Sequence, residues 1–386
     1  MPPVQIDDEF VRCPHAAHAR LREQGPVHRA VAPDGSAIWL VTSYDDVRAA
    51  LADPRLSLDK ANAAGGYRGL SLPPALDANL LNMDAPEHTR LRRITAKAFA
   101  SRKTDGLRSR VREIADDLLD AIDDRSEVDL MAAYAGPLPI AVICELLGVD
   151  ADARPDFRAW TDELLAPSTK DGAASAMRSL YGYLLELIAR KRAQPGEDVL
   201  STLLDEQDRL TEDELLSTAF LVLFAGYENT VNLIGNGLAV LLKHPEQLAA
   251  LRANPDLLPS AVEEVLRFDP PPLLSIRRFP LEDVEIGGVR IPAGDTVMLS
   301  LVSAHRDPAR FADPDSLDLG RTGNPHLAFG HGPHFCLGAS LARMEAEVAF
   351  GALLDRFPDL ALAPGELRWR PSFRNRGPLA LPVRLT

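Results

Sequence analysis

The spacing of apolar and polar residues along the chain predicts mostly helices. Residues 105–123 and 175–193 carry apolar side chains at helical spacing. A longer pattern begins after Thr211 and continues to about Lys243, and it is apolar on nearly all sides. Thr211 and Glu214 fit a capping box at its start. We therefore expect a long, buried helix of roughly 45 Å, enough to cross a domain.

Two shorter helices are also predicted. Ser43 can cap a helix that continues through Leu51, after the strand-like residues 37–41. Ser260 and Glu263 fit a second capping box, which would open a short helix ended by the prolines at 270–272.

The pattern changes to β structure after this helix. Residues 284–286 and 289–291 flank Gly287-Gly288, which is typical of a β-hairpin with a two-residue turn. The fold class is therefore mainly α with a small β portion. Because no flexible linker, low-complexity tract or repeat interrupts the 386 residues, we predict a single domain covering 1–386.

Charge and composition exclude several functions. The net charge of -14 argues against a nucleic-acid-binding protein. No apolar run is long enough to span a bilayer, and the N-terminus lacks the pattern of a signal peptide. We expect a cytoplasmic protein without a membrane segment. One basic stretch is a local exception to the acidic character: Arg90, Arg92, Arg93, Lys97, Arg102 and Lys103. This basic stretch fits either a solvated helix face or a docking surface.

The strongest chemical signal is the glycine-rich loop 329–338, which precedes a predicted helix. Cys336 would lie near the N-terminus of that helix, where backbone N–H groups and the helix dipole stabilise a thiolate. Three interpretations remain open on the loop alone. Cys336 could be a buried structural cysteine, a zinc ligand together with His331 and His334, or an axial ligand of heme.

The loop resembles the signature of the cytochrome P450 family, in which Phe329, Gly332, Cys336 and Gly338 fill the characteristic places. The resemblance extends over nearly the whole chain. It implies the cytochrome P450 fold, with the long central helix passing over heme b and the ligand loop before a C-terminal helix. It also implies that Cys336 is the axial ligand to the heme iron.

Further residues are assigned by the same resemblance. Segment 82–92 is similar to the start of the family's helix on the proximal side of the heme. This resemblance implies that His88 and Arg92 point at the heme propionates. Arg278 and His334 match two more propionate contacts. The chemistry agrees with these assignments, because carboxylates withdrawn from water need cations and arginine can bind them with two hydrogen bonds.

Another resemblance concerns Glu264 and Arg267, which look like the family's Glu-x-x-Arg pair. Their three-residue spacing places both charges on one helix face. The resemblance implies a buried structural pair rather than a catalytic one.

The middle of the long helix resembles the family's oxygen-binding groove, where the helix widens above the heme. Ala225 is assigned to the heme-facing surface, and Glu228 fills the usual acidic position. Asn229 stands where the family usually has threonine, and Thr230 follows it. We take Glu228, Asn229 and Thr230 as the candidate catalytic residues. An amide is a poor proton relay compared with a hydroxyl, so proton delivery should differ from the usual path.

The implied function is insertion of one oxygen atom from O2 into a small molecule, by default a hydroxylation. Electrons would come from NAD(P)H through a ferredoxin reductase and a ferredoxin docked on the basic stretch. The alternatives are a peroxide-driven peroxygenase and a non-catalytic heme-thiolate sensor or carrier. We expect a monomer. The substrate should be hydrophobic or amphipathic, for example a natural product that the enzyme modifies. This follows because the segments that match the family's pocket are mainly apolar. They are 61–81, 221–224, 273–276 and the surroundings of Phe373.

Overall fold

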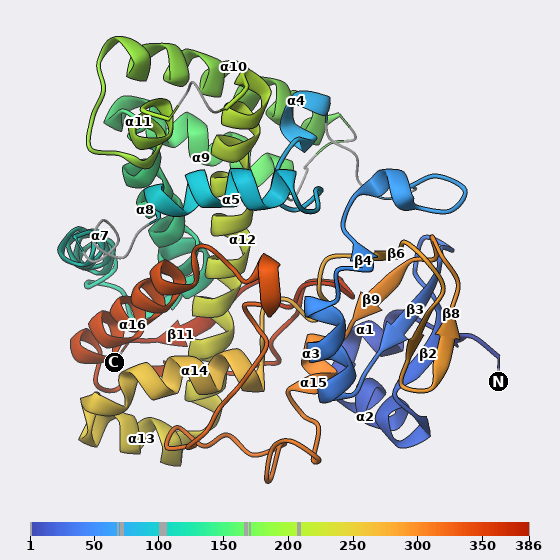
Figure 1. Ribbon diagram of the computed structural model, residues 1–386. Coiled ribbons are helices and arrows are strands. Elements are labelled where there is room, and N and C mark those ends of the chain that lie inside the picture. Colours follow the sequence, from blue (N-terminus) through green and yellow to red (C-terminus); the bar gives the residue numbers. More distant parts are fainter. Residues whose placement is uncertain are drawn as a thin grey trace.

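The computed structural model describes residues 2–67, 69, 73–99, 106–165, 169, 171–206 and 210–385. Helices gather on one side of the molecule and the main sheet on the other (Figure 1). This arrangement confirms the expected mainly α fold with a small β portion. The helices are α1 Asp8–Arg12, α2 Pro14–Gln24, α3 Tyr44–Ala52, α4 Pro74–Asp77, α5 Glu87–Ala98, α7 Arg108–Asp120, α8 Pro137–Leu147, α9 Arg154–Leu165, α10 Gly172–Ala193, α11 Val199–Leu204, α12 Glu212–Lys243, α13 Pro245–Ala253, α14 Leu258–Phe268, α15 Leu301–Ala304 and α16 Ala339–Arg356.

The largest sheet has the strand order β1-β2-β3-β9 and packs beside α2, α3 and α15. The predicted hairpin is confirmed as β7 and β8, joined by Gly287 and Gly288, which both have positive φ. Such angles suit glycine in a tight hairpin turn. The strands are β1 Val4–Gln5, β2 Val27–Val31, β3 Ala37–Val41, β4 Leu56–Ser57, β5 Glu127–Asp129, β6 Phe279–Pro280, β7 Val284–Ile286, β8 Val289–Ile291, β9 Val297–Leu299, β10 Ala361–Leu362 and β11 Pro382–Arg384.

The long helix α12 forms the centre of the helical side and contacts α4, α8, α14 and α16. Its predicted capping box is present: Thr211 Oγ1 accepts a hydrogen bond from the N–H of Glu214, and Glu214 accepts one from the N–H of Thr211. Phe220, Ile234 and Leu238 are almost completely buried in the main hydrophobic core. The helix therefore holds the surrounding elements in place.

The second predicted capping box, at Ser260 and Glu263, is wrong. Helix α14 begins at Leu258, three residues before the start that this capping box predicts, with Pro259 in its first turn, so Ser260 is already inside the helix. The Ser260 hydroxyl donates to the carbonyls of Leu257 and Leu319 instead. Proline suits the first helical turn because that position needs no N–H donor.

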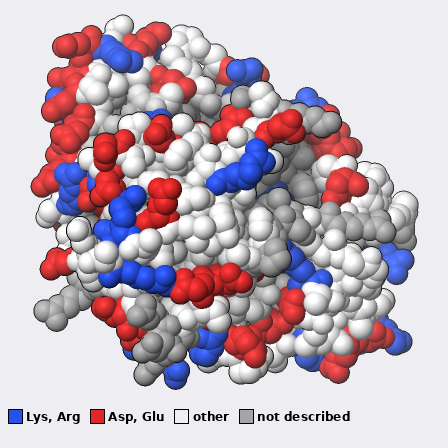
Figure 2. Space-filling model, turned by 90° about the horizontal axis from the view of Figure 1, so that it is seen from above, with Lys and Arg blue, Asp and Glu red and all other residues white. Residues whose placement is uncertain are grey.

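Acidic and basic side chains are interspersed on the face seen in Figure 2. None of the helices within the described ranges combines the length and the apolar character that a membrane crossing requires.

Candidate active site

The glycine-rich loop folds into a tight turn in front of α16. The Cys336 N–H donates to the carbonyl of Phe329 at 2.9 Å, which closes the loop. Gly330 and Gly332 both have a φ of 76°, in the region that favours glycine. A Cβ atom on Gly332 would also lie 3.0 Å from the Cα of Ala52 in α3. Gly332 is therefore required both by the turn and by the close packing of α3.

The Cys336 thiol lies just before α16, where Gly338 is the N-cap residue. Burial raises its pKa, while the N–H of Gly338 and the charges of Arg92 and Arg343 oppose that rise. The residue is nevertheless exposed to solvent, so its side chain has many protein atoms around it and can still be reached from outside. The helix end favours the thiolate as expected, but it does not outweigh desolvation; a metal ion at the sulfur would supply the missing positive charge.

Four cationic or potentially cationic residues meet beside Cys336. His88 and Arg92 lie one turn apart on α5, and the rings of His88 and His334 are 3.9 Å apart between centroids. Arg92 also donates to the carbonyl of Phe335. Burial, followed by the charges of His88 and Arg278, lowers the pKa of His334 to about 3. The structure thus brings together His88, Arg92, Arg278 and His334, the four predicted propionate contacts.

Among the described residues, no carboxylate forms an ion pair with this group, although Asp84 acts on it from a longer distance. Arg278 is buried, and its pKa is lowered to about 10 by that burial. Its guanidinium donates to the carbonyls of Leu51 and Leu56, while its Nε and the Nε2 of His88 have no hydrogen-bond partner within the described part of the chain. Buried donors without acceptors are costly. Two carboxylates placed here would satisfy them, so the residues fit the propionates of a heme.

Gly338 supports the same interpretation. Apart from its two neighbours in the chain, no atom of the described residues lies within 4 Å of the place where a Cβ of Gly338 would be. This space leaves room for a group bound against the loop. By contrast, within the part of the chain that the structure describes, no three His, Cys, Asp or Glu side chains converge as a metal site, so the zinc interpretation of His331, His334 and Cys336 gains no support.

The centre of α12 presents an accessible polar side chain. Asn229 is exposed, whereas Tyr227 and Thr230 beside it are buried and residues 224–226 and 228 are half-buried. Its Nδ2 donates to the carbonyl of Ala225, one turn earlier, at 3.2 Å. Thr230 is buried, which agrees with the turn of about 100° between consecutive helical residues. The helix is continuous here, so the expected widening is not seen; the local feature is the Asn229–Ala225 hydrogen bond.

Glu228 is oriented by the C-terminal segment. Its Oε2 accepts a hydrogen bond from Asn375 Nδ2 at 3.3 Å, and its Oε1 lies 3.7 Å from Arg370 Nη1. Sequence reasoning missed both partners, because each lies about 140 residues away in a segment without a motif. The structure therefore gives Glu228 a neighbourhood different from that of Asn229.

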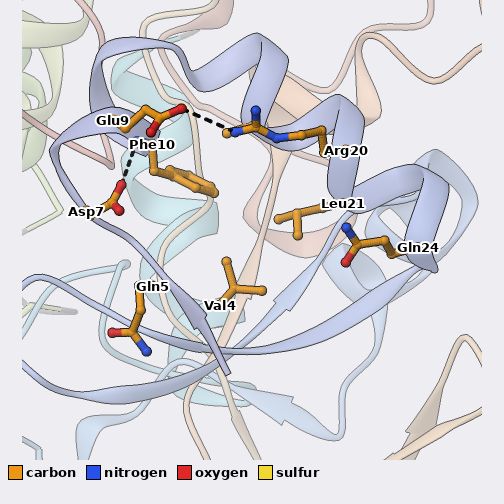
Figure 3. A pocket seen from close by; sticks show the side chains of 9 residues that line it. Val4, Gln5, Asp7, Glu9, Phe10, Arg20, Leu21 and Gln24 are labelled. Atoms are coloured by element: carbon orange, nitrogen blue, oxygen red, sulfur yellow. Dashed lines mark hydrogen bonds and ion pairs between the residues drawn. The ribbon is translucent and has the colours of Figure 1, made fainter. Parts of the chain in front are cut away.

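Two surface pockets lie away from this centre. One of about 240 Å³ lies between β1, α1 and α2, where Glu9 and Arg20 approach within 3.9 Å (Figure 3). The other, of about 360 Å³, is lined by Lys243 and residues of the segment 362–367. Neither is lined by a residue of the Cys336 loop.

The basic stretch is only partly a free charged face. Arg90 pairs with Glu214, and Lys97 Nζ lies 2.6 Å from Glu206. Arg93 is exposed on α5. Arg102 and Lys103 lie outside the described residues, as do residues 70–72 of the predicted pocket loop.

Comparisons with known proteins agree with this geometry. The family model for cytochrome P450 matches residues 154–372, more than half of the chain. Cytochrome P450 monooxygenase PikC of Streptomyces venezuelae is 50% identical, covering 98% of this chain and 92% of that protein. Vitamin D(3) 25-hydroxylase of Pseudonocardia autotrophica is 46% identical, covering 97% and 94%. The solved structure of the tirandamycin C-bound P450 monooxygenase TamI is 46% identical, covers 100% of both chains and gives a TM-score of 0.91. The chain therefore belongs to the cytochrome P450 family, and it is a monooxygenase that carries heme with a cysteine thiolate as the axial ligand to the iron.

Proposed function

We propose that this monooxygenase hydroxylates a hydrophobic or amphipathic small molecule, with Cys336 as its iron ligand and a ferredoxin as its electron donor. The observation that carries the proposal is the convergence of His88, Arg92, Arg278 and His334 beside Cys336. Arg92 and Arg278 supply cations, and the two histidines supply ring nitrogens for hydrogen bonds, which two heme carboxylates need. When bound, heme supplies the reductive activation of O2, which a thiolate ligand promotes by donating electron density.

The substrate assignment rests on the lining of α12 and on the relatives. Leu221, Val222 and Phe224 are half-buried apolar residues within one or two turns of the exposed Asn229. The relatives include a vitamin D(3) 25-hydroxylase and the tirandamycin C-bound P450 monooxygenase TamI. Both facts support a sizeable, largely apolar substrate. The predicted pocket segment 273–276 needs a correction, because Leu273 and Leu274 are buried in a core with residues of β2, β3 and α2.

Isotope labelling tests the reaction class. The holoenzyme is supplied with NAD(P)H, a ferredoxin reductase, a ferredoxin and a panel of apolar ligands chosen by their effect on the heme spectrum. With isotopically labelled O2, we expect one labelled oxygen atom in the product and the other in water. Turnover that requires added peroxide, with no incorporation from O2, would contradict the proposal.

Asn229→Ala is expected to uncouple the reaction. Asn229 is the accessible polar residue at the centre of α12 and can hold a water molecule or donate a hydrogen bond to a reacting oxygen. Without it, NAD(P)H consumption should continue while product formation falls several-fold and hydrogen peroxide rises. Product and peroxide formed per NAD(P)H consumed are the quantities to measure.

Thr230→Ala is the matched control, because Thr230 is adjacent but buried. It should change the ratio of product to NAD(P)H much less than Asn229→Ala. The reverse order of the two effects would contradict the role given to Asn229. If both variants form as much product per NAD(P)H as the wild type, the substrate itself would have to supply the group that delivers protons.

Arg93→Glu is expected to slow reduction by ferredoxin at low ionic strength and to weaken its salt dependence. Arg93 is exposed on α5, the helix that also carries His88 and Arg92. Complementary charge mainly accelerates encounter, and salt screens it. Lys97→Glu should slow the reduction by ferredoxin less than Arg93→Glu does, because Lys97 already pairs with Glu206. Stopped-flow reduction measures the effect, and Arg252→Glu on α13 is the control; equal rates for Arg93→Glu and Arg252→Glu would remove Arg93 from the docking surface.

A further inference from the structure

The buried arginines fall into two groups. Arg267 pairs with Glu264 and Arg306 pairs with Asp315, each at 2.7 Å. Arg277 and Arg278 are also buried, yet neither forms an ion pair with any carboxylate of the described residues. A guanidinium stays protonated in proteins, and a buried charge without a partner is strongly destabilising. Within the described residues, carboxylates act on both arginines only from beyond ion-pair distance: Asp84 and Asp53 on Arg278, and Asp77 and Asp59 on Arg277. An anion in direct contact would therefore stabilise each of these side chains.

For Arg278 the anion is a heme propionate, but Arg277 lies in different surroundings. Arg278 donates to carbonyls of Leu51 and Leu56, whereas Arg277 donates to the Leu81 carbonyl at 3.4 Å and to Asn82 Oδ1 at 2.5 Å. The charges that act on Arg278 include Asp84 and Asp53. Arg277 therefore stands outside the propionate cluster.

The surroundings of Arg277 are the segments that resemble a substrate pocket. Its guanidinium lies 5.1 Å from the centre of the Tyr67 ring. Asn82, which accepts a hydrogen bond from Arg277, follows in the same part of the chain. Arg374 is near enough to lower the pKa of Arg277 further, after the larger effect of burial. Ile276 precedes Arg277 and is half-exposed. Arg277 thus lies where the loop 61–82, the segment after α14 and the C-terminal segment meet.

Part of the donor capacity of Arg277 is unused. A guanidinium has five N–H donors. Nη1 and Nη2 each make one hydrogen bond, the first of them long, and Nε has no partner. Asp77 of α4, a carboxylate whose charge acts on Arg277, is already bound by Lys60 at 2.7 Å and by Asn82. Lys60 and Asn82 therefore compensate most of the Asp77 charge, which weakens the attraction between Asp77 and Arg277.

We propose that Arg277 binds a carboxylate of the substrate, so that the enzyme acts on an apolar molecule bearing an acid group. This inference rests on the proposed function, because it names the substrate class of the same site. Charge-assisted hydrogen bonds from a buried guanidinium give both affinity and orientation. The carboxylate would fix one end of the molecule and thereby decide which carbon is presented for oxidation.

The test compares matched ligands. Dodecanoate and 1-dodecanol share a chain and differ in the charged end group. Binding to the ferric holoenzyme at neutral pH is followed by the heme spectrum and, independently, by calorimetry. The wild type should bind dodecanoate about tenfold to a hundredfold more tightly than the alcohol. Equal affinities, or tighter binding of the alcohol, across chains of ten, twelve and sixteen carbons would overturn the proposal.

Two variants separate substrate binding from a purely structural role. Arg277→Gln should lose the preference for dodecanoate while binding 1-dodecanol as the wild type does. Asn82→Ala removes the main hydrogen-bond partner of Arg277 but keeps its charge, so the preference should survive or increase. If Asn82→Ala loses the preference too, or if Arg277→Gln weakens both ligands equally, Arg277 only fastens the loop. Each protein is first checked for the carbon monoxide spectrum of thiolate-bound heme; absence of that spectrum in the wild type would refute the proposed function instead.

Discussion

Glu264→Ala is expected to yield little folded holoprotein. Glu264 is fully buried and accepts two hydrogen bonds from Arg267, at 2.7 and 2.8 Å. Arg321 Nε, the N–H of Asp318 and Asn324 Nδ2 also donate to it. Removing the carboxylate leaves two guanidinium groups without their anion. Breaking a buried ion pair in this way costs about 3–5 kcal/mol, a large share of a typical folding free energy of roughly 5–15 kcal/mol.

The measurement is the yield of soluble heme-containing protein and the denaturant midpoint of whatever folds. Asp116→Ala is the matched control, because Asp116 pairs with Arg112 on the surface of α7. An exposed pair contributes under about 1 kcal/mol, so this variant should resemble the wild type. A Glu264→Ala protein with the wild-type midpoint and full heme content would show that the pair does not stabilise the fold.

Features set by short-range sequence patterns were predictable. The capping box of α12, the hairpin β7–β8 and the pairing of Glu264 with Arg267 all follow from residues two to four positions apart. The second capping box failed because Pro259, the second residue of α14, fits the first turn of a helix that begins before Ser260. Local patterns identify an element more reliably than its first residue.

Contacts between distant segments could not be predicted. Arg321 and Asn324 join Glu264 from more than fifty residues away, and Asn375 reaches Glu228 from the C-terminal segment. No motif marks these residues, since their roles arise only when the chain folds back on itself. The absence of a carboxylate partner for Arg277 is likewise visible only in three dimensions.

Cys336→Ala is expected to abolish thiolate ligation completely. Cys336 lies beside His88, Arg92, Arg278 and His334; burial raises its pKa, and the N–H of Gly338 and the charge of Arg92 oppose that rise. Alanine offers no ligand atom, so the iron would lose its axial sulfur. Cys13 is the matched control, because it is an exposed free cysteine at the junction of α1 and α2. Cys13→Ala should be indistinguishable from the wild type.

The absorption spectrum of the reduced protein under carbon monoxide tests the central claim most directly. We predict that the wild type and Cys13→Ala show the strongly red-shifted Soret band of thiolate-bound heme, and that Cys336→Ala lacks it. A wild-type protein that binds zinc and no heme, or a Cys336→Ala protein that keeps the band, would contradict the assignment of Cys336 as the heme ligand.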